Sequence, residues 1–252
     1  MPDLDSVVRD LVIANRILAH EGVLDAYGHV SIRHPERPDR FLISCSRAPE
    51  LVEAHDIGEY DLEGRLVAKH AIAASGEGGD HKPYLERFIH GGIFEARPDV
   101  MAVIHSHAED TLHFGITKEP LIPVIHNASR MGMRVPVWDI RDAFGDTNML
   151  VCNAAQGRDL AHALGPNSVA LMRGHGFAAA GANLLEVVGL AVYLPKNARV
   201  LTNALRLGSV NPLSSGEIDQ IHHGPQPHDW KRAWEYWSRR AGFGPHATAS
   251  DT

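Results

Sequence analysis

The stretch Asp99-Val-Met-Ala-Val-Ile-His-Ser-His107 has the pattern of a buried strand that ends in two histidines. Side chains at positions i and i+2 of a strand point to the same face, so we expect His105 and His107 to project together. Two imidazoles placed side by side can bind one divalent ion. An isolated His-x-His pair is equally consistent with a strand cap beside a buried core histidine. The pair therefore indicates a metal site only if other residues complete it.

Two other segments supply candidate ligands. Ser168-Val-Ala-Leu-Met172 is another short hydrophobic run, and Arg173-Gly-His-Gly176 follows it with glycines on both sides of His175. Glycines let the backbone approach closely, which can direct this histidine into a cleft. Upstream, the segment from Pro83 to Ala96 has a helical pattern, with Glu86 in its first turn, and it leads into the histidine strand.

The order of these motifs resembles the class II aldolase/adducin family over about residues 6–206: a glutamate at a helix start, Arg-Pro-Asp, a strand, His-Ser-His and a later Gly-His-Gly. The resemblance implies that His105, His107 and His175 bind one divalent metal ion. It also implies that Glu86 is the catalytic acid/base and a fourth ligand when substrate is absent. Manganese or zinc is the favoured ion, and ferrous iron or cobalt suits the same ligands.

The pattern of elements predicts an α/β fold. Strands and helices alternate without a strict βαβ series and without a Gly-x-Gly-x-x-Gly motif. This favours a three-layer αβα sandwich with a mostly antiparallel central sheet, which the resemblance also implies. The predicted helices cover about 4–18, 83–96, 109–114, 157–164 and 183–205, the last kinked or interrupted at Pro195, and the predicted strands cover 29–33, 40–44, 65–69, 99–107, 135–137, 148–151 and 168–172.

Length and composition limit the other classes of protein. The 252 residues are 44% hydrophobic and 22% charged, enough for one catalytic domain over 1–207 and an aromatic-rich tail over 208–252 that packs on the body or on a neighbouring subunit. The net charge of −7 argues against nucleic-acid binding, and no apolar run approaches the roughly 20 residues that span a membrane. Two cysteines form no disulfide framework. We expect a cytoplasmic protein.

Three segments differ from the family's sugar-phosphate aldolases, in which small residues hold a phosphate. They read Gly28-His-Val-Ser31, Ser44-Cys-Ser-Arg47 and Gly79-Asp-His-Lys-Pro-Tyr-Leu85 here, with added imidazole and guanidinium groups. Because arginine pairs bidentately with carboxylates, we expect a small anionic substrate that carries carboxylates in place of a phosphate. The candidate substrate contacts are His29, Ser31, Ser44, Arg47, His126 and Arg173.

The same variants resemble most closely the family's metal-dependent decarboxylases of hydroxylated aromatic or pyridine dicarboxylates. We therefore expect a carbon-carbon lyase that decarboxylates such a compound in a catabolic pathway, with Glu86 as proton donor or relay. That role asks for a raised pKa, which the sequence leaves open.

Several alternatives also stay open. One is an aldolase that cleaves an unphosphorylated hydroxy-oxo acid or sugar; others are a non-haem iron oxygenase and a non-catalytic adducin-like module. The resemblance further implies a homo-oligomer, commonly a tetramer with active sites between subunits.

Overall fold

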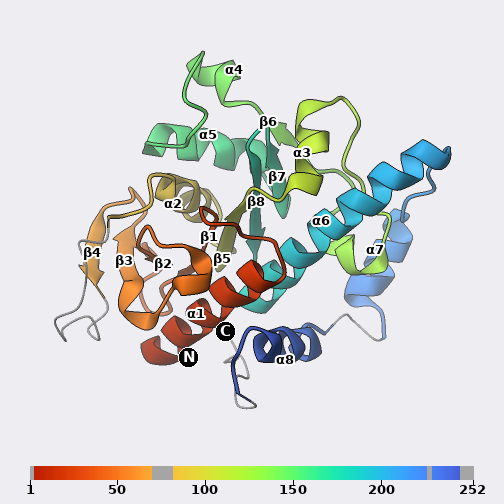
Figure 1. The fold of residues 1–252 in the computed structure, drawn as a ribbon. Coiled ribbons are helices and arrows are strands. Elements are labelled where there is room, and N and C mark those ends of the chain that lie inside the picture. The colour runs from red at the N-terminus through yellow and green to blue at the C-terminus, as the bar shows by residue number, and fades with distance from the viewer. Residues whose placement is uncertain (1–2, 70–81, 226–228, 245–252) are drawn as a thin grey trace.

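The computed structural model describes residues 3–69, 82–225 and 229–244. One eight-stranded sheet forms the centre of the fold, with helices on both faces (Figure 1). In spatial order the strands are β4 (Leu66–Lys69), β3 (Ile57–Asp61), β2 (Arg40–Ser44), β1 (His29–Arg33), β5 (Ala102–Ser106), β8 (Gly176–Gly181), β7 (Val169–Met172) and β6 (Val137–Trp138). Every neighbouring pair is antiparallel except β6 and β7. The predicted three-layer αβα sandwich with a mostly antiparallel sheet is confirmed.

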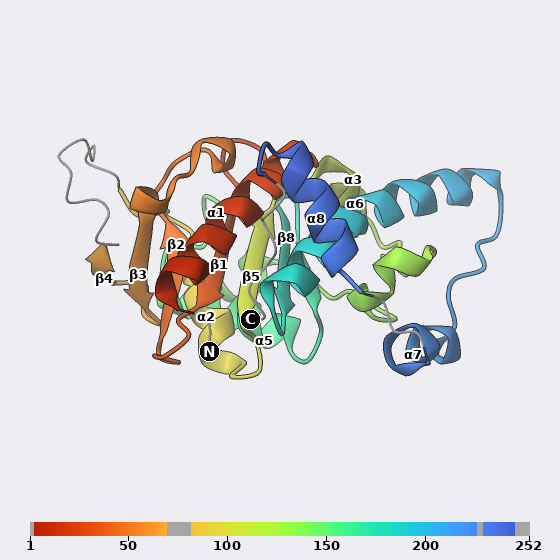
Figure 2. The same cartoon turned by 90° about the horizontal axis from the view of Figure 1, so that it is seen from below.

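The helices divide between the two faces of the sheet. One layer contains α1 (Leu4–His20), α3 (Glu109–Ile116), α6 (Leu184–Leu207) and α8 (Lys231–Arg240), and the other contains α2 (Arg87–Ala96), α4 (Ile140–Phe144) and α5 (Ala154–Leu164). Viewed from below, α1 and α8 lie in front of the sheet with α6 beside them (Figure 2). Three short 3-10 turns, η1 (Pro49–Leu51), η2 (Ala54–Asp56) and η4 (His126–Met131), connect the elements, and α7 (Ser215–His223) packs against η4.

Alternation along each strand supplies both hydrophobic cores. In β2, Leu42 packs in the core under α1 and α6, whereas Phe41 and Ile43 pack in the core under α2 and α5. In β5, Ile104 belongs to the first core and Val103 to the second. The side chain at position 105 therefore faces the α2 side of the sheet.

Two strands were not predicted from the sequence. The segment that forms β3 looked like a polar loop because it contains Gly58, Glu59 and Asp61, but Glu59 is buried at the sheet and Arg40 Nη1 lies 2.6 Å from its carboxylate. The strand β8 has a Gly-Phe-Ala-Ala-Ala-Gly sequence without β-branched residues. It forms nonetheless because it pairs on both sides, with β5 and β7.

Two other expectations about local structure were wrong, and a third was wrong in part. Residues 148–151 form no strand, because Met149 adopts a φ of 68° and turns the chain. Helix α2 begins at Arg87, so Glu86 is its N-cap residue and not part of its first turn. Helix α6 continues through Pro195 without interruption, since the buried contacts of its flanking turns outweigh the missing backbone hydrogen bond, and the kink stays a prediction.

The tail after residue 207 contributes to the first core within the same chain. Trp230, Trp234 and Trp237 of the α8 region are buried against α1 and α6. Among the described residues, none of the helices combines the length and the apolar character that crossing a membrane requires.

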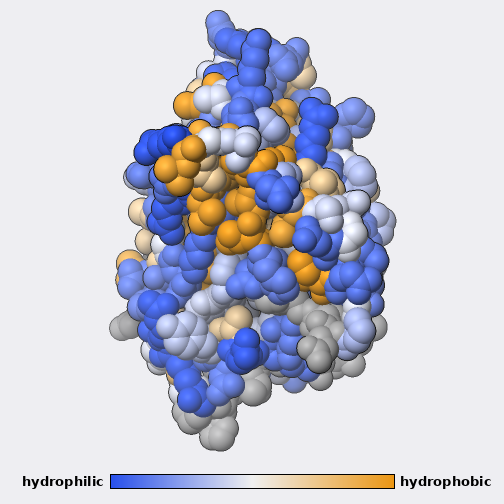
Figure 3. All heavy atoms as spheres, turned by 90° about the vertical axis from the view of Figure 1, so that its right-hand side faces the viewer, coloured by the Kyte–Doolittle hydropathy of each residue, from blue (hydrophilic) through white to orange (hydrophobic). Residues whose placement is uncertain are grey.

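The far end of α6 projects from the body and carries exposed apolar side chains. Val200, Leu205 and Leu207 of this helix are exposed, the last at 91%. Figure 3 views the molecule from that side and shows apolar side chains gathered in the upper half of the face. Apolar surface of this kind is typical of protein–protein contacts. It is compatible with the expected homo-oligomer, which stays a prediction.

Helices α2 and α5 cross at two glycines, and this crossing positions the start of α2. A Cβ atom at Gly157 would lie 2.1 Å from the carbonyl oxygen of Phe88, and one at Gly92 would lie 2.4 Å from the backbone of Gly157. The two backbones therefore touch without intervening side chains. Any larger residue at the crossing must push α2, and with it Glu86, away from the sheet.

We expect Gly157→Ala to lower the free energy of unfolding by about 1 to 3 kcal/mol, because the helices must separate. Urea denaturation measures this loss. Gly216→Ala in α7 is the matched control, because its Cβ would meet only Ser214 Oγ at 3.9 Å. The control should keep or slightly raise stability. Equal losses in the two variants would contradict the close-packed crossing.

Candidate metal centre

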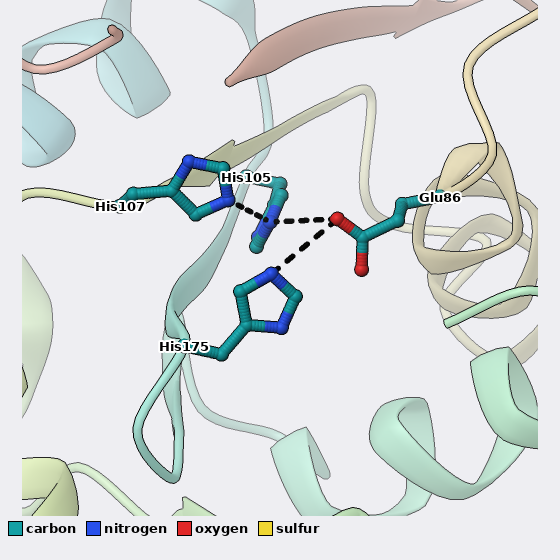
Figure 4. A group of neighbouring side chains, drawn as sticks. All are labelled: Glu86, His105, His107 and His175. Carbon is teal, nitrogen blue, oxygen red and sulfur yellow. Dashed lines mark hydrogen bonds and ion pairs between the residues drawn. The ribbon is translucent and has the colours of Figure 1, made fainter. Parts of the chain in front are cut away.

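Four side chains from three parts of the fold converge at one end of β5 (Figure 4). His105 lies in β5, His107 follows the strand, His175 lies in the turn between β7 and β8, and Glu86 caps α2. Glu86 Oε2 lies 3.4 Å from Nε2 of His105 and 3.4 Å from Nε2 of His175, and the Nε2 atoms of His105 and His107 are 3.0 Å apart. One candidate ligand atom from each residue lies within 4.8 Å of all the others. These are the four residues that the sequence indicated.

The β7–β8 turn depends on its two glycines to present His175. Gly174 has a φ of 64°, in the left-handed region. Gly176 passes so close to β5 that a Cβ atom there would lie 2.0 Å from the carbonyl oxygen of Ser106. Only glycine allows this approach. The turn thereby holds His175 beside the end of the histidine strand.

Hydrogen bonds behind two of the histidines determine which ring nitrogen is free. Nδ1 of His105 lies 3.1 Å from the carbonyl oxygen of Phe177, which can only accept, so Nδ1 carries the proton and Nε2 keeps a lone pair. Nδ1 of His107 lies 3.3 Å from Asp25 Oδ1 in the same arrangement. Burial, together with His105 and His175, lowers the pKa of His107 and favours the neutral ring. Imidazole lone pairs thus face the cluster.

This set of groups fits a divalent cation. The carboxylate of Glu86 and the imidazole lone pairs of His105 and His107 are all hydrogen-bond acceptors, and they converge on one point. Such a group of buried acceptors repels itself unless a positive charge lies among them. Three imidazoles and one carboxylate are ligands that zinc, manganese, ferrous iron and cobalt accept.

Glu86 is held as a carboxylate. Burial opposes its ionisation, but His105 and His175, when these rings carry protons that face the carboxylate, outweigh burial and hold the pKa of this carboxyl well below its ordinary value. Its second oxygen, Oε1, accepts a hydrogen bond of 3.0 Å from the backbone N–H of Val151. The sequence left open whether the pKa is raised, and the structure gives the opposite direction. Glu86 must therefore receive a proton before it can donate one.

A second polar group lies next to the cluster on the same face of the sheet. His29 pairs with His105 across β1 and β5, and their rings are 5.1 Å apart. His29 Nδ1 lies 2.7 Å from Nε2 of His90, whose Nδ1 lies 2.5 Å from Ser31 Oγ. The ring of Tyr84 lies 4.6 Å from that of His29. All four side chains are buried.

Sequence reasoning missed His90 and Tyr84. A signal for the first was present, because His90 lies four residues after Glu86 and a helix places such residues on one face. Burial, with a smaller contribution from His105, lowers the pKa of His90 to about 3. Burial also lowers the pKa of His29, together with His90 and His105. Both imidazoles are therefore neutral at ordinary pH.

The remaining candidate substrate contacts are held by other partners in this chain. Arg47 Nε lies 3.4 Å from Asp56 Oδ2, and Arg173 Nε lies 2.5 Å from Asp139 Oδ2. The hydroxyl of Ser44 donates to the Tyr84 hydroxyl at 3.4 Å.

His126 lies farther away in the fold. It is exposed in η4, which packs in the core on the opposite face of the sheet from α2. Within one chain, the structure thus brings His29 and Ser31 to the neighbourhood of the cluster, but not His126.

Comparison with known proteins identifies the family. Residues 9–202 match the class II aldolase and adducin N-terminal domain, and the chain belongs to this family. A decarboxylase of Talaromyces stipitatus, tropJ, is 33% identical over 260 residues, covering 94% of each chain. The 3,4-dihydroxyphthalate decarboxylase of Arthrobacter keyseri is 30% identical over 193 residues, covering 72% of each. These matches support a lyase of the class II aldolase type.

A solved structure supports the fold. The aldolase II superfamily protein from Pseudomonas syringae superposes with a TM-score of 0.74 at 22% identity, covering 96% of this chain and 94% of that one. At this identity the likeness supports the architecture alone. The family resemblance seen in the sequence motifs is confirmed by the family match.

We expect Asp25→Ala to weaken zinc binding about 10- to 100-fold, because the carboxylate that orients His107 is lost. Competition with a chromophoric chelator measures the affinity. Asp39→Ala, which removes an exposed aspartate between β1 and β2, is the control and should bind zinc like the unaltered protein. Unchanged affinity in Asp25→Ala would contradict the proposed role of Asp25.

The neutral His90 should make the fold sensitive to acid. Its folded pKa of about 3 lies below the ordinary value of 6.5, so between these values the unfolded chain binds a proton that the native state does not. Stability should therefore fall as the pH drops from 6.5 towards 3. For His90→Gln, we expect metal-free protein to lose about 2 kcal/mol less stability between pH 7 and pH 5 than the unaltered protein. Denaturant titrations at both pH values check this, and equal losses would refute it.

Proposed function

We propose that this chain is a metal-dependent decarboxylase acting on a hydroxylated aromatic or pyridine carboxylate. The observation that carries the proposal is the cluster of acceptors formed by Glu86, His105, His107 and His175, which fits one divalent cation. The decarboxylases among the relatives support this chemistry over other activities of the family. We propose manganese or zinc as the ion and a small anionic molecule as the substrate.

A divalent ion in this site would supply a Lewis acid that stabilises negative charge on a substrate oxygen as the carbon-carbon bond breaks. The protein's own groups handle the proton. Because Glu86 is ionised, it can accept the proton of the substrate hydroxyl and return it to the ring carbon that bears the leaving carboxylate. The bond between the ring carbon and that carboxylate then breaks, and carbon dioxide leaves. The electron pair of the broken bond stays with the ring and restores its aromaticity. Solvent reprotonates the hydroxyl.

The surroundings of the cluster favour a substrate that is itself anionic and planar. His29 and Tyr84 form a buried wall of rings next to His105. Arg47 and Arg173 are partly exposed and each pairs with one aspartate, so either could exchange that partner for a substrate carboxylate. We propose these four residues as the substrate-facing groups of one chain.

The direct test is carbon dioxide release from 3,4-dihydroxyphthalate and related hydroxylated aromatic and pyridine carboxylates, with manganese- or zinc-loaded protein. We expect metal-dependent release that Glu86→Gln lowers about 10²- to 10⁴-fold, because the proton relay is lost. His175→Ala should lose both metal and release. Glu95→Gln is the matched control, because Glu95 lies in α2 but is bound to Arg158 at the surface.

Other reaction products would change the function assigned to this protein. Pyruvate or an aldehyde without carbon dioxide would identify an aldolase, and strict dependence on oxygen would identify an oxygenase. Protein that binds no metal would contradict the proposal and leave a non-catalytic module.

A further inference from the structure

A chain of three buried side chains leads to the metal centre, where its last ring lies beside that of His105. Ser31 Oγ lies 2.5 Å from His90 Nδ1, and His90 Nε2 lies 2.7 Å from His29 Nδ1. The side chains of Ser31 and His90 are fully buried, and the His29 residue is 1% exposed. Each of the two hydrogen bonds in this chain contains one proton. The direction in which each proton is donated determines what the last ring offers to a ligand.

Ser31 sets the direction of the chain. Among the residues that the structure describes, the only hydrogen-bond partner of its hydroxyl is His90 Nδ1. If His90 donated to Ser31, the serine O–H would be buried with no acceptor, which costs about 1 to 3 kcal/mol. The hydroxyl therefore donates to His90 Nδ1.

The proton positions of the two rings follow from this. A neutral imidazole has one N–H, so His90 carries its proton on Nε2 and donates it to His29 Nδ1. His29, also neutral, must then carry its proton on Nε2. Among the described contacts, the serine thus fixes the tautomer of a histidine to which it is hydrogen-bonded only through His90.

The free end of the chain lies beside the metal centre. Register pairing across β1 and β5 places His29 and His105 on the same face of the sheet, with their rings 5.1 Å apart. In the described part of the chain, Nε2 of His29 has no hydrogen-bond partner. A protonated Nε2 has no lone pair to bind a metal ion. His29 is accordingly not a fourth imidazole ligand, although it lies next to one.

We propose that His90 and Ser31 are positioning residues that hold His29 as a neutral N–H donor, and that this donor binds an anionic oxygen of the substrate. The oxygen would belong to a carboxylate other than the one that leaves. This inference rests on the proposed decarboxylase function for the identity of the substrate, but the tautomer itself does not depend on it. A fixed N–H donor also makes the site selective between substrates, because it cannot accept a hydrogen bond from a substrate group that can only donate one.

Nitrogen-15 NMR of zinc-loaded protein labelled at histidine tests the tautomer. His29→Gln identifies the His29 signals by their loss. We expect Nε2 of His29 to give a pyrrole-type signal and Nδ1 a pyridine-type signal. Ser31→Ala should mix the two types, because nothing then fixes the proton on His90. A pyrrole-type Nδ1 in His29 of the unaltered protein would overturn the proposal.

Kinetics test the role in binding. His90→Leu should raise KM for 3,4-dihydroxyphthalate about 10- to 100-fold, since a hydrogen bond to a charged group loses its orientation, with a smaller effect on kcat. His90→Gln should retain much of the affinity, because its amide can still donate to His29. For 2,3-dihydroxybenzoate, which lacks the second carboxylate, His90→Leu and the unaltered protein should behave alike. Equal losses for both substrates would overturn the proposed contact.

Two controls separate this inference from the assignment of function. Metal content should be the same in both His90 variants, because neither change touches a ligand. His34→Gln replaces a buried histidine at the end of β1, away from the cluster, and should leave the kinetics unchanged. If the unaltered protein releases no carbon dioxide, the proposed function fails, while the NMR signals still decide the tautomer.

Discussion

The repulsion among buried acceptors at the end of β5 is the constraint on which the site depends. Glu86 and the imidazoles of His105 and His107 direct negative charge and lone pairs at one point. Proteins tolerate such a group only when a cation compensates it. The hydrogen bonds behind these imidazoles support the same conclusion, because a carbonyl oxygen and Asp25 hold the other ring nitrogens as donors.

The metal ligands come from different elements of the fold, so the position of each ligand depends on a different packing contact. The two strand histidines follow from alternation in β5, and His175 depends on the close approach of Gly176 to that strand. Glu86 depends on the glycine crossing of α2 and α5. No single element could supply this arrangement. The rigid sheet fixes two ligands, and helix and turn packing bring the other two to them.

The sequence was informative where the chemistry follows local periodicity. The two-residue period of a strand predicted that His105 and His107 lie on one face. The glycines on both sides of His175 predicted that this histidine is directed into a cleft. It was uninformative where pairing partners decide structure, as in β8, whose alanine-rich sequence has little strand propensity of its own. His90 was missed for a related reason. Its role depends on Ser31 and His29 of a distant strand, which no local pattern reveals.

The arginines illustrate a second limit of sequence reasoning. Arg47 and Arg173 were expected to face substrate because of their charge, but the fold gives each an aspartate partner from another segment. Charge type can be read from a sequence, whereas charge compensation depends on tertiary contacts. The chain of buried histidines is the converse case. There, burial removes the charge and leaves a directional donor, a property that neither residue has by itself.

The most direct test of the metal centre is anomalous diffraction from crystals grown with manganese or zinc, collected on both sides of the metal absorption edge. One anomalous peak enclosed by Nε2 of His105, His107 and His175 and the carboxylate of Glu86 is the predicted result. Crystals that show metal only elsewhere, with these four side chains still converging on an empty point, would contradict it.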